Sequence, residues 1–316
     1  MTFGRIEAVE PLAGDASSRR YRRVRLPGGR LAIEVVYPPG EESVLGRDLE
    51  VRAWLEAHGV RVPALLAADV GTGRALLEDL GRTPLSALLA RASGGRRLEI
   101  AEATLAPLET LARLDPAALP PWNEPLGERR LRWELTGFEL WFLRYGHGIE
   151  PSPAVRDWLD RLASRLGRHP RRVCHRDYHP DNLFLLPDGT TAVIDFQDLL
   201  VGPDTYDVAS FLGDRDTPEL FSPEDRERLA RRWAERTGAG PGWEERLAET
   251  SVQRGLKVLG TFARLTACGR PAYGRWIGPL QRRMAEAAVE LGAPEALTAW
   301  LRRPLPPGWY NAGERG

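Results

Sequence analysis

Lysine is almost absent from this sequence: of the 44 basic residues only Lys257 is a lysine, and the others are arginines. A codon bias of the genome is a sufficient explanation. The composition still limits which side chain can touch a phosphate, because nearly every available cation is a guanidinium. Cysteine is scarce too, since Cys174 and Cys268 lack the paired spacing of a zinc site or a disulfide framework. Such cysteine usage suits a reducing cytoplasm.

Net charge and long apolar runs are also missing. The 44 acidic residues balance the 44 basic ones, so no global field draws the chain to nucleic acid or to an anionic membrane. No apolar run approaches the length of a membrane span, and residues 1–14 contain no apolar core of a signal peptide. We therefore expect a cytoplasmic monomer with a small-molecule partner and without nucleic acid or membrane partners.

The two halves of the sequence differ in their hydrophobic pattern. With 316 residues, the chain is long enough for one large domain or for two lobes. Up to Asp79 we expect two antiparallel strand pairs and one helix: a hairpin around Pro27-Gly28-Gly29, a helix over residues 44–58, and strands at 64–68 and 74–78.

Helical periodicity dominates after this point. A β-like island at residues 171–196 interrupts it. The predicted helices cover residues 84–92, 98–114, 128–145, 153–168, 204–212, 223–237, 243–267 and 274–301. The sequence therefore predicts an α+β protein with a small β-rich lobe, residues 1–79, and a larger, mostly helical lobe, residues 80–316.

The β-like island carries the residues that point to chemistry. It contains His175-Arg176-Asp177-Tyr178-His179-Pro180-Asp181-Asn182, a Pro-Asp-Gly turn, and then Val-Ile-Asp195-Phe. Phosphoryl transfer from ATP needs a carboxylate that orients the acceptor hydroxyl and takes its proton, and oxygen ligands for Mg²⁺. Asp177 fits the first role, and Asn182 with Asp195 fits the second, because this spacing matches the kinase signature. The alternative is that Asp177 and Asp195 are ordinary loop carboxylates that cap turns.

This pattern resembles the aminoglycoside-phosphotransferase and choline-kinase group, and more narrowly the anomeric kinases that phosphorylate N-acetylmuramate and N-acetylglucosamine. The resemblance implies a protein-kinase-like two-lobed fold that uses ATP and Mg²⁺. The segments that carry the narrower match are residues 14–21, 77–81, 175–182, 193–198, 202–203 and 253–257.

Nucleotide binding is expected in the β-rich lobe. The small residues between the first strands would let backbone amides approach phosphates, and a hinge segment would contact adenine. The predicted nucleotide-binding residues are Gly14, Asp15, Ser17, Ser18, Arg19, Glu78 and Leu80.

The lysine that pairs with ATP phosphates in kinases has no counterpart, because the equivalent strand has Glu34. Arg19, Arg20 and Arg22 are candidate replacements. The helix carboxylate that normally holds the lysine, Glu50 at best, would then be optional.

The acceptor must lie beside Asp177. Candidates for contact with it are Tyr178, His179, Gln197, Asp198 and Glu134. Asp207 is better explained as an anchor of the catalytic loop.

Three functions are compatible with these residues. The leading hypothesis is transfer of the ATP γ-phosphate to the C1 hydroxyl of an N-acetylated amino sugar in peptidoglycan recycling. A kinase for an aminoglycoside or an amino alcohol is the second. A pseudokinase that binds nucleotide without turnover is the third, motivated by the missing lysine.

Overall fold

A computed structural model describes residues 6–12 and 18–310. The chain forms two compact units, each of which is described by itself. One comprises residues 1–114 with 180–199, and the other comprises residues 115–179 with 200–316. The lobe boundary expected from the sequence, between residues 79 and 80, stays a prediction.

The first unit is built around an antiparallel sheet. Within the described residues this sheet has five strands, β1(Ala8–Leu12), β2(Arg20–Arg25), β3(Leu31–Val36), β5(Arg74–Glu78) and β4(Leu65–Asp69), in that spatial order. Helix α1(Glu42–Ala57) covers one face, where Val35, Tyr37 and Ala75 pack with Leu45. The two predicted strand pairs and the helix are thus confirmed, and β1 is a fifth strand that was not part of the predicted pairs.

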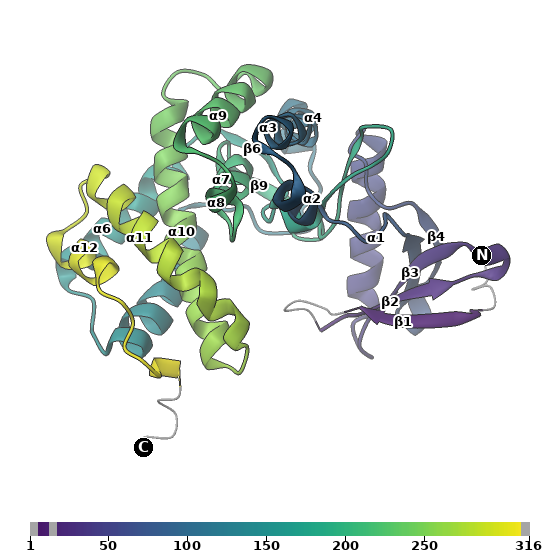
Figure 1. Ribbon diagram of the computed structural model, residues 1–316, viewed down its shortest axis with the longest axis horizontal. Coiled ribbons are helices and arrows are strands. Elements are labelled where there is room, and N and C mark those ends of the chain that lie inside the picture. The colour runs from purple at the N-terminus through teal and green to yellow at the C-terminus, as the bar shows by residue number, and fades with distance from the viewer. Residues whose placement is uncertain (1–5, 13–17, 311–316) are drawn as a thin grey trace. The chain divides into compact units, whose positions relative to one another are not determined.

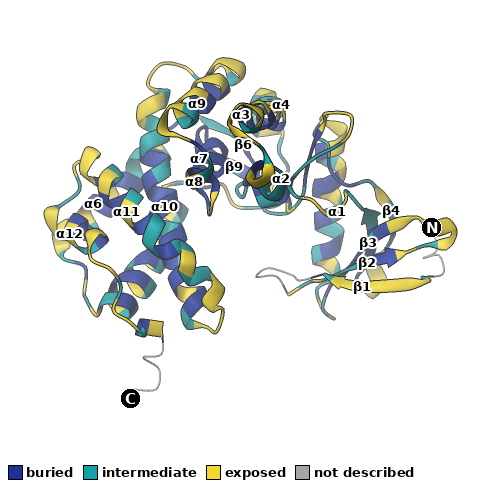
Figure 2. Ribbon diagram, viewed as in Figure 1, coloured by how far each residue is buried: buried dark blue, intermediate teal, exposed yellow. Residues whose placement is uncertain are grey.

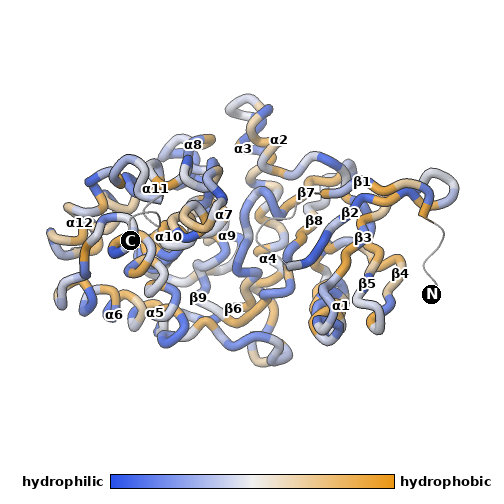
Figure 3. Tube along the Cα trace, turned by 90° about the horizontal axis from the view of Figure 1, so that it is seen from below, coloured by the Kyte–Doolittle hydropathy of each residue, from blue (hydrophilic) through white to orange (hydrophobic). Residues whose placement is uncertain are grey.

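The strands of this sheet differ sharply in polarity. Figure 3 shows β2 as largely hydrophilic and β3 as largely hydrophobic, in keeping with the sequences RYRRVR and LAIEVV. Because side chains alternate between the two faces of a strand, the arginines of β2 point to both faces. Each buried arginine therefore needs a carboxylate partner, as Arg23 finds in Asp79 at 2.5 Å.

Short helices and a hairpin complete the first unit. They are α2(Leu85–Arg91), α3(Gly94–Ala103), α4(Ala106–Arg113), the hairpin strands β7(Leu183–Leu185) and β8(Thr191–Val193), and the single 3-10 turns η1(Pro27–Gly29), η2(Val70–Thr72) and η5(Pro180–Asn182). The prediction of one helix over residues 98–114 is wrong. The helix ends after Ala103 and a second begins at Ala106, because Pro107 fits a first turn but not a helix interior.

Helix α10(Trp243–Ala267) is the centre of the second unit, and its predicted bounds, 243–267, are confirmed. It is buried along much of its length (Figure 2). It packs against α5(Glu128–Gly137), η4(Phe138–Gly146), α6(Pro153–Gly167), α7(Tyr206–Gly213) and α11(Gly274–Glu290). Together these helices enclose a continuous apolar core that includes Phe138, Phe142 and Leu259.

The remaining elements of the second unit include one strand that the sequence did not predict. They are β6(Arg171–Cys174), β9(Leu200–Pro203), α8(Thr217–Leu220), α9(Pro223–Thr237), α12(Glu295–Arg302) and the 3-10 turns η3(Pro116–Ala118) and η6(Pro271–Tyr273). The unpredicted strand β9 pairs antiparallel with β6. A single helix over 274–301 is wrong, because Gly292 has φ 67° and Pro294 follows it, so the chain turns between α11 and α12.

The α+β class is confirmed, with a β-sheet in the first unit and a helical second unit. In the described ranges, no helix is both long and apolar enough to cross a bilayer.

The close approach of α10 to the junction of α5 and η4 depends on Gly260. A Cβ built on Gly260 of α10 would lie 2.4 Å from the Phe138 nitrogen and 2.5 Å from the Gly137 carbonyl carbon. These are backbone atoms, which cannot rotate away, at the point where α5 continues into the wider π-helical segment η4. Gly137 itself has no atom within 4 Å of such a Cβ.

We expect Gly260→Ala to lower the free energy of unfolding by about 1–3 kcal/mol, because overpacking forces the two helices apart. The matched control Gly137→Ala should be neutral or stabilising by up to about 1 kcal/mol, since alanine favours helix. Urea denaturation of both variants measures this difference. Equal stability of the two variants would contradict the packing argument.

Candidate active site

The loop that follows β6 contains the predicted catalytic base, and one carboxylate holds its backbone. The amides of His175 and Arg176 donate to the two oxygens of Asp207, at 2.7 and 2.8 Å. Asp207 is buried in the first turn of α7. Its predicted role as an anchor of this loop is therefore confirmed, and the side chain of His175 is buried, with 1% exposure.

Backbone strain concentrates near the predicted site residues. In the part of the chain that the structure describes, positive φ occurs in three residues other than glycine: Arg176 at 79°, Asp195 at 61° and Arg215 at 45°. Such conformations cost about 1–3 kcal/mol each and persist only where the surroundings enforce them. Two of the three are next to Asp177 or are the predicted metal ligand Asp195 itself.

A buried arginine from α10 faces the predicted base. Arg254, whose side chain is 4% exposed, lies 3.0 Å from Asp214 and 3.5 Å from Asp177. It also donates to the Arg176 carbonyl at 3.0 Å and lies over the Tyr206 ring. One guanidinium therefore contacts both the side chain of the predicted base and the backbone of its loop.

The charges around Asp177 keep its carboxyl group ionised. Burial alone would raise the pKa, but Lys257, Arg254 and Arg176 outweigh burial and hold the pKa of Asp177 well below its ordinary range. The same balance, with His179 and Arg254 as the opposing charges, lowers the pKa of Asp214. An ionised carboxylate can accept a hydrogen bond from a hydroxyl.

Glu134, a predicted acceptor contact, lies in a buried network. Its carboxylate accepts from Arg176 at 3.1 Å and from Gln253 at 3.4 Å, and its side chain is 2% exposed. These contacts support the catalytic loop from α5 and α10. Contact of Glu134 with an acceptor stays a prediction.

Tyr178 and His179 are the other two predicted acceptor contacts in the second unit. Tyr178 is fully buried, with its ring 6.2 Å from that of Phe211. The amide of His179 donates to the Asp177 carbonyl at 3.0 Å and so closes a tight turn after the base. Both side chains are buried in this structure, and their contact with an acceptor stays a prediction.

The two predicted metal ligands lie at the two ends of the β7–β8 hairpin in the first unit. The Ile194 amide donates to the Asn182 carbonyl at 2.9 Å, which brings the residue before Asp195 next to Asn182. The Asp195 carboxylate is 42% exposed and accepts from Gln197 at 2.9 Å. Asp198, the remaining acceptor candidate, is half-buried in the same turn.

The donor atoms of this hairpin fit a hard cation. A carboxylate oxygen from Asp195 and an amide oxygen from Asn182 are ligands that suit Mg²⁺, which usually keeps waters and phosphate oxygens as its other ligands. Over residues 6–12 and 18–310, three or more His, Cys, Asp or Glu side chains do not cluster in a metal-binding arrangement. Within these residues, no cluster of such side chains could therefore bind a metal ion by itself. This is compatible with a metal ion that is held jointly by a few side chains and by the phosphates of a nucleotide.

The structure describes Asp177 in the second unit and Asn182 with Asp195 in the first. Convergence of these three residues on one ion and one triphosphate therefore stays a prediction. We base this prediction on the order of the three residues along the chain and on the spacing of five positions from Asp177 to Asn182.

The predicted nucleotide-binding residues divide into two groups. Gly14, Asp15 and Ser17 lie outside the described residues. Ser18 donates to Glu41 at 3.2 Å, and Arg19 lies 3.3 Å from Asp48 of α1 and 3.6 Å from Asp195. Arg19 is thus next to the predicted metal ligand.

The predicted adenine-binding segment follows β5. Glu78 pairs with Arg61 at 2.6 Å, and these hydrogen bonds hold the pKa of Glu78 below its ordinary value. The Glu78 amide also donates to the Ala64 carbonyl at 2.9 Å. Leu80 is half-buried directly after this strand end. Adenine contact with either residue stays a prediction.

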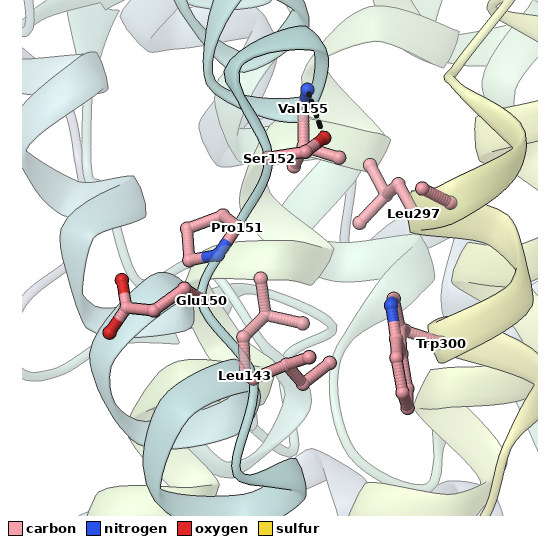
Figure 4. Close-up of a pocket in the computed structure, with 9 residues that line it drawn as sticks. Leu143, Glu150, Pro151, Ser152, Val155, Leu297 and Trp300 are labelled. Carbon is pink, nitrogen blue, oxygen red and sulfur yellow. Dashed lines mark hydrogen bonds between the residues drawn. The ribbon is translucent and has the colours of Figure 1, made fainter.

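The second unit contains a hollow between η4, the start of α6 and α12. Figure 4 shows Leu143, Pro151, Leu297 and Trp300 facing it, while the Glu150 carboxylate points away. Ser152 begins α6 there by accepting from the Val155 amide at 3.4 Å. Its lining is mostly apolar and includes none of the predicted site residues, so we assign it no part in the reaction.

Sequence reasoning missed Arg254 as the partner of Asp177 and Asp214 as the second carboxylate that Arg254 contacts. Arg254 lies within the Gln-Arg-Gly-Leu-Lys segment that contributes to the resemblance, so that segment was the available signal. The pairing itself joins residues 77 positions apart. No local pattern marks such a contact.

The fold is shared with known kinases. Choline kinase LicA from Streptococcus pneumoniae matches 90% of this chain and 94% of its own, with a TM-score of 0.61 and 18% identity. The GDP and kanamycin complex of APH(2'')-IIia matches 90% of this chain and 94% of its own, with a TM-score of 0.60 and 15% identity. The protein-kinase-like fold implied by the sequence is therefore confirmed.

Sequence similarity is more specific. The Phosphotransferase enzyme family matches residues 8–248. The N-acetylmuramate/N-acetylglucosamine kinase of Pseudomonas aeruginosa is 35% identical over 324 residues, which cover 97% of this chain and 91% of that relative. This chain belongs to the phosphotransferase enzyme family, and the expectation of a small-molecule kinase is confirmed.

We expect Arg254→Met to lower the free energy of unfolding at pH 7 by about 3–5 kcal/mol, because it removes the arginine that pairs with the buried Asp214 at 3.0 Å. The pKa of Asp214 would then rise, whereas in the unchanged protein it lies below its ordinary value. The stability gap between the two proteins should therefore be largest at pH 7 and shrink as the pH falls below about 5 and Asp214 becomes protonated.

Urea denaturation at pH 7 and at about pH 4 measures this gap. Exposed Arg264 on the same helix supplies the matched control, and Arg264→Met should change stability by less than about 0.5 kcal/mol. The double variant Arg254→Met/Asp214→Asn should be more stable than Arg254→Met alone. A gap that does not depend on pH would show that buried charge is not its cause.

Proposed function

We propose that this protein is an ATP- and Mg²⁺-dependent sugar kinase. It transfers the γ-phosphate to the anomeric C1 hydroxyl of N-acetylmuramate, N-acetylglucosamine or both. The products are ADP and a sugar 1-phosphate, which places the reaction in peptidoglycan recycling. The Pseudomonas aeruginosa relative supports this choice of acceptor by its name and by 35% identity along nearly the whole chain.

The observation that carries the proposal is the environment of Asp177. The loop is fixed by Asp207, and Arg254 lies 3.5 Å from the Asp177 carboxylate. Enzymes of this class gain most of their rate from positioning and electrostatics, because the transition state is loose. A carboxylate kept ionised by its neighbours is suited to orient the acceptor hydroxyl.

In the proposed reaction, Asp177 accepts a hydrogen bond from the C1 hydroxyl and holds its oxygen toward the γ-phosphorus. As the new O–P bond forms and the bond to ADP breaks, the hydroxyl proton passes to Asp177 and then to solvent. The lowered pKa of Asp177 makes it a weak base, so orientation precedes proton transfer.

Asn182 and Asp195 would hold Mg²⁺, which neutralises phosphate charge when it is bound. Gln197 donates to Asp195 and fixes the orientation of that carboxylate. We assign the backbone of residues 14–19 to the phosphates, the segment from Glu78 to Leu80 to adenine, and Tyr178, His179, Gln197, Asp198 and Glu134 to the acceptor side. The cytoplasmic location and the monomeric state stay predictions.

The proposal is tested by incubating the protein with Mg-ATP and single acceptors, following ADP release and locating the new phosphate by phosphorus and proton NMR. Phosphate at C1 of either amino sugar is the expected result. Transfer to kanamycin or choline alone would establish the second hypothesis instead. ATP binding without turnover on any acceptor would identify a pseudokinase.

We expect Asp177→Asn to lower kcat by about 10²–10⁴-fold, because the amide can neither accept the proton nor supply the charge. Affinity for ATP should remain within about threefold. The control is Asp188→Asn, in the exposed hairpin turn where Asp188 accepts from the Thr190 amide, and it should keep full activity. Unchanged turnover in Asp177→Asn would remove Asp177 from the mechanism.

A further inference from the structure

The strand position that carries the phosphate-binding lysine in kinases is occupied by a carboxylate here. Glu34 of β3 is 0% exposed and is bound by Arg22 at 2.5 Å and by Arg74. A buried carboxylate that is paired with two arginines cannot attract a phosphate, because both groups are negatively charged. If the protein uses a cation at this point, another element must supply it.

Arg19 is the cation that the first unit places beside the predicted metal ligand. One guanidinium nitrogen, Nη2, lies 3.6 Å from Asp195, and the other, Nη1, lies 3.3 Å from Asp48. Phosphates coordinated to a cation on Asp195 would lie within reach of the same guanidinium, because an arginine carries five N–H donors in a fixed plane.

The contacts of Asp48 suit it to hold the Arg19 side chain in place. It lies on α1 with its side chain 7% exposed, and it accepts from the Tyr37 hydroxyl at 2.7 Å. The Arg19 guanidinium carbon is 5.8 Å from the ring centres of both Tyr21 and Tyr37. A buried carboxylate and two rings therefore hold an arginine side chain whose exposure is only 14%.

The alternation of side chains along β2 separates Arg19 from the other two candidates. Tyr21 packs on the α1 side of the sheet with Tyr37, and Arg19 makes its contacts on that side. Arg22 is engaged with Glu34, and exposed Arg20 is, like Arg22, at an even position of the strand. Of these three described arginines, Arg19 is the one that forms an ion pair with Asp195.

We infer that Arg19 binds the nucleotide phosphates in place of the strand lysine and that Asp48 is its positioning residue on α1. This inference rests on the proposed function. The pair differs from the lysine–glutamate pair of kinases in two ways. The cation comes from the start of β2 instead of β3, and the helix carboxylate is Asp48, whereas Glu50 is exposed.

The chemistry of the pair explains how one side chain fills both roles. A guanidinium can keep one nitrogen on Asp48 while another donates to a phosphate oxygen, which a single ammonium cannot do in the same geometry. Arg19→Lys should therefore restore only part of the phosphate affinity that Arg19→Met loses. Asp48→Asn should weaken phosphate binding without removing the cation.

The test compares ATP, ADP and AMP binding by calorimetry in the presence of Mg²⁺, for the full chain and its variants. A residue that contacts the outer phosphates changes the ratio of ATP to AMP affinity, whereas a structural defect weakens all three ligands alike. We expect Arg19→Met to lower ATP affinity by about 10- to 100-fold and AMP affinity by less than about threefold. Asp48→Asn should shift the ratio in the same direction by a smaller factor.

The matched control is Arg20→Met, which removes the neighbouring exposed arginine and should leave the ratio unchanged. An unchanged ratio in Arg19→Met, or an equal shift in Arg20→Met, would overturn the inference. If a thermal melt shows that Arg19→Met is not folded, the ratio of ATP to AMP affinity in Arg19→Lys and Asp48→Asn tests the inference instead.

Failure of the proposed function gives a different result. Binding of ATP without sugar phosphorylation by the unchanged protein would reject the sugar-kinase proposal, and the ratio would still decide the role of Arg19. Normal sugar phosphorylation with an unchanged ratio in Arg19→Met would reject only the inference. Absence of any nucleotide binding by the unchanged protein would reject both.

Discussion

Two consecutive backbone amides donate to the Asp207 carboxylate, and the loop that contains the proposed base Asp177 depends on this contact. The amides of His175 and Arg176 converge on one buried side chain of α7, which holds Arg176 at φ 79°. A residue with a Cβ keeps such a conformation only under constraint. The orientation of the loop backbone next to Asp177 is thus fixed by Asp207, a residue 30 positions further along the chain.

Buried charge is organised in the same way in both units. Arg254 lies between Asp177 and Asp214 in the second unit, and Arg19 lies between Asp48 and Asp195 in the first. In each case one guanidinium contacts a supporting carboxylate and a carboxylate assigned to the reaction. Multiple donors on one planar group make arginine suited to this use, and this chain has nearly no other cation.

Most elements of the fold follow from the sequence, and the exceptions have identifiable causes. Helix α10 agrees with its apolar periodicity because it is buried against several partners. The predicted helices over 98–114 and 274–301 each divide in two, at Pro107 and between Gly292 and Pro294. Strand β9 was not predicted, since a four-residue strand is defined by its partner β6 more than by its own pattern.

By itself, the sequence determined the class of chemistry. The spacing of Asp177, Asn182 and Asp195, with a turn between them, identified a phosphotransferase because a loop and a hairpin are local structures that short-range patterns encode. Only the tertiary structure decided which charges surround these residues. Arg254 and Asp48 come from helices distant in sequence, and no local pattern specifies which face of a packed helix meets a given loop.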